Sequence, residues 1–190
     1  MQAFETQLRD AVKTALARPE IPTAVHQVYE TIDKRLHEIK PACGMTGKCC
    51  HFEEYGHRLF VSTGELAAFV ADIAHAPAAV AHAPDGTSCR FQVGNLCTAH
   101  SARPMGCRLF FCDPHSDREL SELYETMHQQ LKRLHDQLEI PYFYVEWRQA
   151  LVSIAPLIGG QTPPIPNPHL PNAPLPSPPS PTPLADSPTP

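Results

Sequence analysis

All seven cysteines of this 190-residue chain fall between residues 43 and 112. Two of them, Cys49 and Cys50, are adjacent, and adjacent Cα atoms lie about 3.8 Å apart, which is short for an unstrained disulfide. An odd number of cysteines also argues against a closed disulfide framework. Inert core thiols would not gather in turn-rich sequence, so the clustering favours metal ligation. The candidate ligands are Cys43, Cys49, Cys50, Cys89, Cys97, Cys107 and Cys112.

Cations lie close to these cysteines in the sequence. Arg90 follows Cys89, Arg108 follows Cys107, and Arg103 lies four residues before Cys107. A nearby cation lowers the pKa of a thiol and offsets the negative charge of a thiolate site. We therefore expect Arg90, Arg103 and Arg108 to help bind the cofactor.

The spacing of the cysteines does not identify the metal. Structural zinc sites usually contain cysteine pairs separated by about two to four residues, and Cys107 and Cys112 are the pair that fits this spacing. Iron–sulfur proteins accept more varied spacings, and the plant-type pattern also contains a gap of this length. We expect either zinc or an iron–sulfur cluster.

The stretches CGMTGKCC and CRFQVGNLCTAHSARPMGCRLFFC resemble the YkgJ-like cysteine-cluster family, which is also described by a CxxCxxCC motif. The second stretch carries the specific features: a glycine, a leucine, an Arg-Pro step and a Cys-Arg step, at Gly94, Leu96, Arg103, Pro104, Cys107 and Arg108. The resemblance covers about residues 40–115. It implies a zinc- or iron-chelating or iron–sulfur domain, and thus a cofactor more than an activity.

The chain departs from the family pattern at Thr46, where the resemblance implies an additional cysteine. A histidine can supply a missing ligand. The candidates are His51, His100 and His115. About 10 Å of helix would separate His128 from His135, which is too far for both to bind one ion. They are predicted to lie on a solvated helix face instead.

Hydrophobic periodicity predicts a largely helical chain. Apolar residues at helical spacing indicate helices at residues 2–17, 22–40 and 116–139. The Ser-x-x-Glu spacing of a capping box occurs at Ser62, where a further helix is expected to begin, and again at Ser116.

Signals for strands are few. Residues 58–62 are predicted to form a short strand, residues 76–88 a loop, and residues 142–154 a strand or a final helix. We expect a mainly α fold, in which a small helical domain holds a metal-ordered, cysteine-rich irregular centre with one or two short strands.

Composition divides the chain at Pro156. From this residue onward lie 14 of the chain's 22 prolines and a single charged residue, Asp186. Such a segment cannot bury enough apolar surface to pack. We expect a cysteine-cluster metal-binding domain at residues 1–155, with its cysteine core at 43–112, and a disordered proline-rich tail at 156–190.

Charge and hydropathy argue against two classes of partner. Residues 1–150 contain 15 Lys and Arg against 19 Asp and Glu, which gives no basic surface for nucleic acid. No apolar run approaches the length of a membrane span, and the first residues do not have the pattern of a secretory signal. We expect a cytoplasmic protein that binds a metal ion or cluster and has scope for a protein partner, without nucleic acid or membrane.

Motifs for common enzyme mechanisms are missing from the sequence. It contains no Gly-rich phosphate loop, GxSxG, HExxH or dinucleotide fingerprint. We expect a binding protein rather than an enzyme, which holds zinc or an iron–sulfur cluster for metal handling, electron transfer or support of a partner enzyme. Two alternatives are a thiol-redox enzyme that uses Cys49 and Cys50, and a scaffold with a purely structural zinc site.

Overall fold

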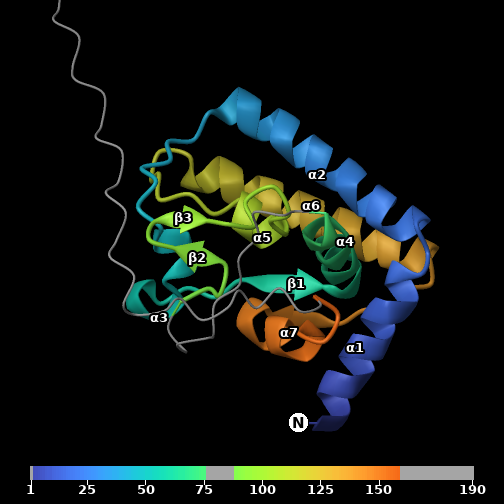
Figure 1. Cartoon of the computed structure of the whole chain (residues 1–190). Helices are drawn as coiled ribbons and strands as arrows, with labels where there is room; N and C mark the ends of the chain where they lie inside the picture. Colours follow the sequence, from blue (N-terminus) through green and yellow to red (C-terminus); the bar gives the residue numbers. More distant parts are fainter. Residues whose placement is uncertain (1, 76–87, 159–190) are drawn as a thin grey trace, which may run out of the picture.

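In the computed structural model of the chain, residues 2–75 and 88–158 are described, and the expected mainly α fold is confirmed. Within these residues there are seven α-helices and two short two-stranded sheets (Figure 1). The predicted loop, apart from Ser88, and the predicted tail from residue 159 onward lie outside the described residues. No helix in the described part is both long enough and apolar enough to cross a membrane.

Four long helices form the body of the fold. α1 (Gln2–Leu16) is followed by α2 (Glu20–Ile39), and α4 (Thr63–Ala74) packs against both, whereas α6 (Asp117–Gln137) packs against α2 (Figure 1). Nine of the twelve residues of α4 are buried, which makes it the central helix. The helices predicted from hydrophobic periodicity are therefore confirmed, with ends that differ by a few residues.

The two predicted capping boxes differ in outcome. At the start of α4 the Ser62 hydroxyl accepts a hydrogen bond from the Glu65 N–H, and Glu65 Oε2 accepts one of 2.9 Å from the Ser62 N–H, as predicted. The capping box predicted at Ser116 is wrong. Ser116 already has helical backbone angles, and its hydroxyl donates a hydrogen bond of 2.8 Å to Asp113 Oδ2 instead of capping α6.

A short antiparallel sheet connects the middle of the chain to its last helix. β1 (Phe60–Ser62) pairs with β4 (Tyr144–Glu146), with Val61 opposite Val145. α7 (Trp147–Ile154) begins directly after β4. The segment predicted as a strand or a helix is thus a short strand followed by a helix.

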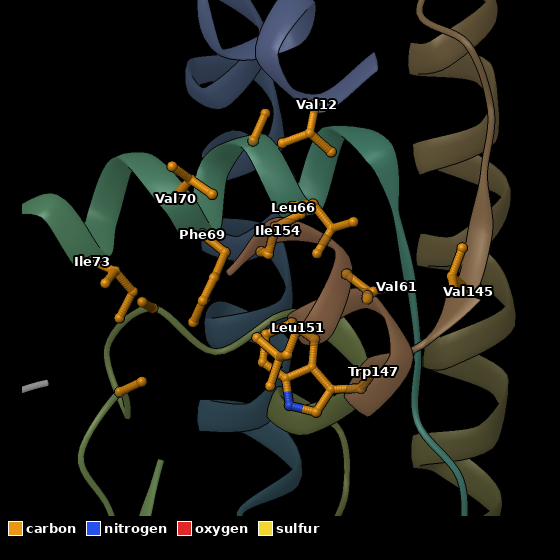
Figure 2. Close-up of a cluster of buried hydrophobic side chains, with 14 of the residues drawn as sticks. Val12, Val61, Leu66, Phe69, Val70, Ile73, Val145, Trp147, Leu151 and Ile154 are labelled. Carbon is orange, nitrogen blue, oxygen red and sulfur yellow. The ribbon is translucent and has the colours of Figure 1, made fainter. Parts of the chain in front are cut away.

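The larger hydrophobic core lies between α1, α4, α7 and this sheet (Figure 2). Leu66 and Phe69 of α4 are buried there, and the Trp147 ring meets the Phe69 ring edge-on at 4.9 Å between centroids. Each such side chain contributes roughly 1.5–3 kcal/mol when buried. Leu157 and Ile158, just beyond the predicted domain boundary, are partly buried against the same core. The cysteine-rich region therefore packs against a buried hydrophobic core.

Candidate metal centre

All seven cysteines line one cavity with a volume of about 380 Å³. Its walls come from the loop after α2 together with the single-turn helix η1 (Lys48–Cys50), and from the hairpin of β2 (Gln92–Val93) and β3 (Leu96–Cys97). The short helix α5 (Met105–Arg108) supplies Cys107. The fold thus brings together two cysteine-containing stretches that are far apart in the sequence.

Two hydrogen bonds join these stretches directly. The backbone N–H of Cys89 donates to the carbonyl oxygen of Cys50 at 2.9 Å, and Gln92 Nε2 donates to the carbonyl oxygen of Gly47 at 3.3 Å. Gly47 has a φ of 75°, and a Cβ added there would lie 2.7 Å from Gln92 Nε2. Both the backbone conformation and the close approach therefore require glycine.

A third hydrogen bond joins the ends of the cysteine-rich region. The backbone N–H of Ala42 donates to Asp113 Oδ2 at 3.0 Å. The bonds from Ala42 and from Ser116 hold the pKa of Asp113 below its usual range, so the acceptor is a carboxylate. Because Cys43 and Cys112 are next to these residues in sequence, the bond brings the backbones of two exposed cysteines together at the cavity.

Four cysteines, which we call the inner thiols, interact with one another: Cys49, Cys50, Cys89 and Cys97. The Sγ atoms of Cys49 and Cys50 lie 4.0 Å apart. Hydrogen bonding to Cys50 lowers the pKa of Cys49 to about 6 and that of Cys89 to about 7, and it also lowers the pKa of Cys97. The same bonds raise the pKa of Cys50, which keeps the proton. Three of the inner thiols, those with lowered pKa values, therefore favour the thiolate, the form of cysteine that binds metals.

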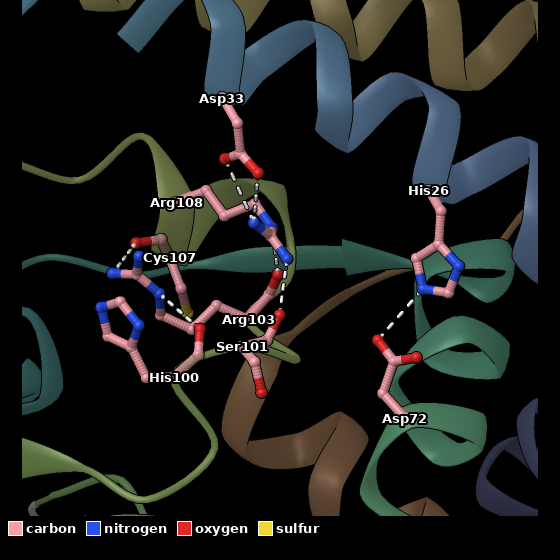
Figure 3. A network of polar contacts seen from close by, with 8 residues as sticks. All are labelled: His26, Asp33, Asp72, His100, Ser101, Arg103, Cys107 and Arg108. Carbon is pink, nitrogen blue, oxygen red and sulfur yellow. Dashed lines mark hydrogen bonds and ion pairs between the residues drawn. The ribbon is translucent and has the colours of Figure 1, made fainter. Parts of the chain in front are cut away.

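Arg103 is the predicted cofactor-binding arginine that lines the cavity. Its Nε donates to the carbonyl oxygen of His100 at 3.1 Å, and its terminal nitrogen donates to that of Cys107 at 3.4 Å (Figure 3). Burial and the neighbouring thiols raise the pKa of Cys107, and the charge of Arg103 opposes this rise. Arg103 is thus positioned to offset the charge of thiolates in the cavity.

The other two predicted arginines lie outside the cavity lining. Arg108 donates hydrogen bonds of 2.7 Å to the carbonyl oxygens of Ser101 and Arg103, and its guanidinium pairs with Asp33 of α2 (Figure 3). Arg90 lines a different pocket, next to α7. Arg108 therefore positions the loop that carries Cys107, and neither arginine is among the residues that line the cavity.

The position at which the family pattern implies a cysteine does face the cavity, because Thr46 lines it. Of the three histidines considered as replacements, His100 also lines the cavity. His51 Nε2 instead lies 2.9 Å from Gln92 Nε2, and His115 is exposed and is not part of the lining. The structure thus favours His100 as a nitrogen ligand over His51 and His115.

His135 corrects one expectation, because it is buried rather than solvated, with only 1% of its surface exposed. Its Nδ1–H donates to the carbonyl oxygen of Leu131 at 2.8 Å, and its Nε2 accepts from the backbone N–H of Gly64 at 3.0 Å. Burial lowers the pKa of His135, so the ring is neutral. It supports the start of α4 and takes no part in the cavity.

Aromatic side chains form much of the cavity wall, a feature that no pattern in the sequence predicted. They are Phe52, Phe69, Phe91, Phe110, Phe111 and Trp147. The indole Nε1 of Trp147 is buried without a nitrogen or oxygen partner among the described residues, and its N–H helps to lower the pKa of Cys89. The sequence offered one signal for this wall, a single tryptophan in an apolar segment. The residues near Trp147 in the sequence, however, do not indicate that it lies beside the cysteines.

The donor set fits a transition metal in its chemistry, although the side chains are not arranged as a finished coordination sphere. Thiolates are soft ligands that select zinc, copper(I) or iron–sulfur clusters. The 4.0 Å between the sulfurs of Cys49 and Cys50 is close to the roughly 3.8 Å expected for a tetrahedral site with bonds of about 2.3 Å. Within residues 2–75 and 88–158, however, no group of three or more His, Cys, Asp or Glu side chains is arranged to hold a metal ion. Ligation would require the thiols to turn toward a common centre.

Comparison with known proteins gave no match. No protein-family model matches it, and neither a curated protein nor a solved structure matches it. The likeness to the YkgJ-like family therefore stays a prediction, and function must be argued from the site.

Proposed function

We propose that the protein binds a polynuclear metal centre, an iron–sulfur cluster, through cysteine thiolates. The observation that carries this proposal is that seven cysteines from two separate stretches line one cavity. All seven are free thiols, which suits a reducing compartment such as the cytoplasm. The role that fits such a centre in a chain without other catalytic motifs is electron transfer or metal handling for a partner protein.

The number of thiols and the size of the cavity favour a cluster over a single zinc ion. A structural zinc site is closed by four ligands and needs no surrounding space. Here seven thiols surround about 380 Å³. Iron–sulfur clusters are held by cysteine thiolates at varied spacings and are larger than one ion, so they make better use of this arrangement.

The residues around the cavity have distinct tasks in this proposal. The inner thiols would hold the iron atoms, and Arg103 would offset part of the negative charge. The aromatic wall limits access of water, which is one of the means by which a protein sets a cluster's reduction potential. When bound, such a cluster supplies one-electron transfer.

The direct test is to purify the full chain without oxygen and to measure iron, sulfide and zinc. We expect about two or more iron atoms per chain with matching sulfide, and absorbance at about 400 nm. A colourless protein with about one zinc per chain would refute the cluster and support the scaffold alternative. Less than about half an equivalent of any transition metal would refute metal binding altogether.

Variants of the inner thiols sharpen this test. Cys50→Ser should lose bound metal and lower the melting temperature together, because the free energy of metal binding also stabilises the fold. Thr46→Ser is the matched control, since it changes a hydroxyl-bearing side chain on the same cavity wall without removing a thiol. Equal metal content in the two variants would contradict the assignment of Cys50 as a ligand.

Thiol redox catalysis is a second candidate, favoured by one observation. Cys49 and Cys50 have sulfurs 4.0 Å apart, and the pKa of Cys49 is lowered to about 6. A disulfide between adjacent residues is strained, which argues against it as a working redox pair. Reduction of a small disulfide substrate by the metal-free protein, abolished by Cys49→Ser, would support this candidate over metal binding.

A further inference from the structure

The seven cysteines differ in their access to solvent. Cys50 and Cys89 are buried, with 8% and 6% of their surface exposed, whereas Cys49, Cys97 and Cys107 are partly buried. Cys43 and Cys112 are exposed, although they line the same cavity. We call these two the outer thiols. The cavity is therefore lined by exposed thiols as well as buried ones.

The structure holds the outer thiols near each other in a defined way. Asp113 accepts the backbone N–H of Ala42 through Oδ2, and its side chain also accepts hydrogen bonds from Ser116 and from the backbone N–H of His115. The carboxylate thereby ties the residue before Cys43 to the residue after Cys112. Two exposed cysteines from opposite ends of the cysteine-rich region are thus kept at one opening.

The opening is also flanked by exposed apolar side chains. Met45 and Leu96, with 70% and 64% of their surface exposed, line the cavity, and Val93 pairs with Leu96 across the β2–β3 hairpin. The charged side chains that line the cavity are Lys48 and Arg103, and both are cations that attract an anionic thiolate complex of a metal. The outer thiols are therefore more accessible than the inner thiols, two of which are buried and two partly buried.

We infer that Cys43 and Cys112 are exchange ligands, which bind an incoming divalent metal ion first and pass it to the inner thiols. This inference rests on the proposed metal-binding function and adds the route by which the site is loaded and emptied. Its substrate is ferrous ion, which supplies the iron of the proposed cluster, arrives bound to thiolates and is replaced by Co²⁺ in the test below. The inner thiols would then be the resting ligands and the outer thiols the transient ones.

The transfer is a ligand exchange without oxidation or reduction. A bond between the metal and a donor thiolate breaks, a bond between the metal and the sulfur of Cys43 or Cys112 forms, and the cysteine proton passes to solvent or to the released donor thiolate. The same exchange, repeated with Cys49 or Cys97, moves the ion inward. No electron donor or acceptor takes part, and the outer thiols are restored for the next ion.

The test follows uptake of Co²⁺ by the metal-free, reduced full chain, because thiolate ligation of Co²⁺ gives a strong charge-transfer absorbance. Co²⁺ is added as the free ion in one arm and as its complex with a small thiol in the other. In Cys43→Ser and Cys112→Ser we expect the same final amount of bound Co²⁺ as in the parent. Uptake and release to a chelator should be slower by about 10-fold or more, because an ion held by one outer thiol instead of two loses the advantage of a linked second ligand. Cys50→Ser should lose binding, and Thr46→Ser should match the parent.

Variants of Asp113 test whether the position of the outer thiols matters when both thiols are present. Asp113→Ala removes the acceptor of the Ala42 N–H and should slow exchange with all seven thiols intact, whereas Asp113→Asn keeps an acceptor oxygen and should retain most of the rate. Unchanged rates in Cys43→Ser and Cys112→Ser would overturn the inference, and so would a loss of bound metal as large as in Cys50→Ser. A parent chain that takes up no Co²⁺ would overturn the inference, whereas the proposed cluster is refuted only if the purified chain lacks iron and sulfide.

Discussion

The guanidinium carbon of Arg108 lies 4.5 Å from the centroid of the Tyr29 ring in α2. The same guanidinium donates to Asp33, one turn further along α2, and to the carbonyl oxygen of Ser101. One largely buried arginine therefore joins the loop before Cys107 to the helical body (Figure 3). Its role is to position the cysteine loop, although its place beside a cysteine in the sequence predicted contact with a cofactor.

Arg108→Lys should lower the free energy of unfolding by about 1–3 kcal/mol, because lysine keeps the charge but cannot stack on Tyr29 and reach both acceptors at once. Bound metal should fall as well, since Cys107 loses its support. Urea unfolding and metal analysis measure the two effects. Arg118→Lys, which changes an exposed arginine paired with Glu122, is the control and should behave like the parent. Equal stability of the two variants would contradict this role.

Gly47→Ala should destabilise the protein and separate the two cysteine stretches. A non-glycine residue in the left-handed region costs about 1–3 kcal/mol, and here the new Cβ would also lie 3.1 Å from the Asn95 Cα. Gly56→Ala is the matched control, because Gly56 has a φ of 64° with no atom within 4 Å. Urea unfolding should show a loss in both variants, but rapid alkylation of Cys50 should occur only in Gly47→Ala. Similar alkylation rates in both would mean that the close approach is unimportant.

Thr46→Cys should increase the metal content or the thiolate absorbance per chain, because the new thiol would line the same cavity as the other seven. The measurement is metal analysis together with a count of reactive thiols. If His100 already occupies the place of the missing ligand, His100→Ala in the parent should lower metal content, and Thr46→Cys should restore it. An added thiol that stays reactive while metal content is unchanged would show that seven thiols are sufficient.

His135→Gln should reduce the loss of stability on mild acidification. Burial lowers the pKa of His135 in the folded protein below its ordinary value of 6.5, so the unfolded state takes up the proton first as the pH falls. The contribution of His135 to stability is therefore fully present above pH 6.5 and is lost as the pH falls toward the folded pKa. Urea unfolding at about pH 7.5 and about pH 5.5 should show a smaller drop in the variant than in the parent. His115→Gln, at an exposed site, should show the parent's drop; a full drop in His135→Gln would contradict the assignment.

Local patterns in the sequence predicted the parts of the fold that depend on local physics. The apolar stripes of α1, α2 and α6 bury one face of each helix, so their spacing alone locates them. The Ser62 capping box also formed, because its two partners are three residues apart. At Ser116 the same pattern failed, since Asp113 offers the hydroxyl a nearby carboxylate that a three-residue pattern does not consider.

Features that depend on distant partners could not be predicted from the same patterns. Trp147 reaches the cavity because β4 pairs with β1. It is the first residue of α7, and from there its indole lies close enough to Cys89 to lower the pKa of that thiol. His135 is buried because α4 begins against it, which no spacing within α6 indicates. The clustering of the cysteines did predict a shared location, but their division into buried and exposed thiols follows from how the two stretches pack.

Trp147 is the chain's single tryptophan, and its ring both packs on Phe69 in the core and forms part of the cavity wall. The protein thus contains a built-in fluorophore at the boundary between its core and its thiols. Loss of packing around the indole would shift its emission as the chain unfolds, and a bound iron centre next to the ring would quench the same emission. Folding and cofactor loading can therefore be followed in one sample, by one native signal, without attaching a dye to any of the cysteines under study.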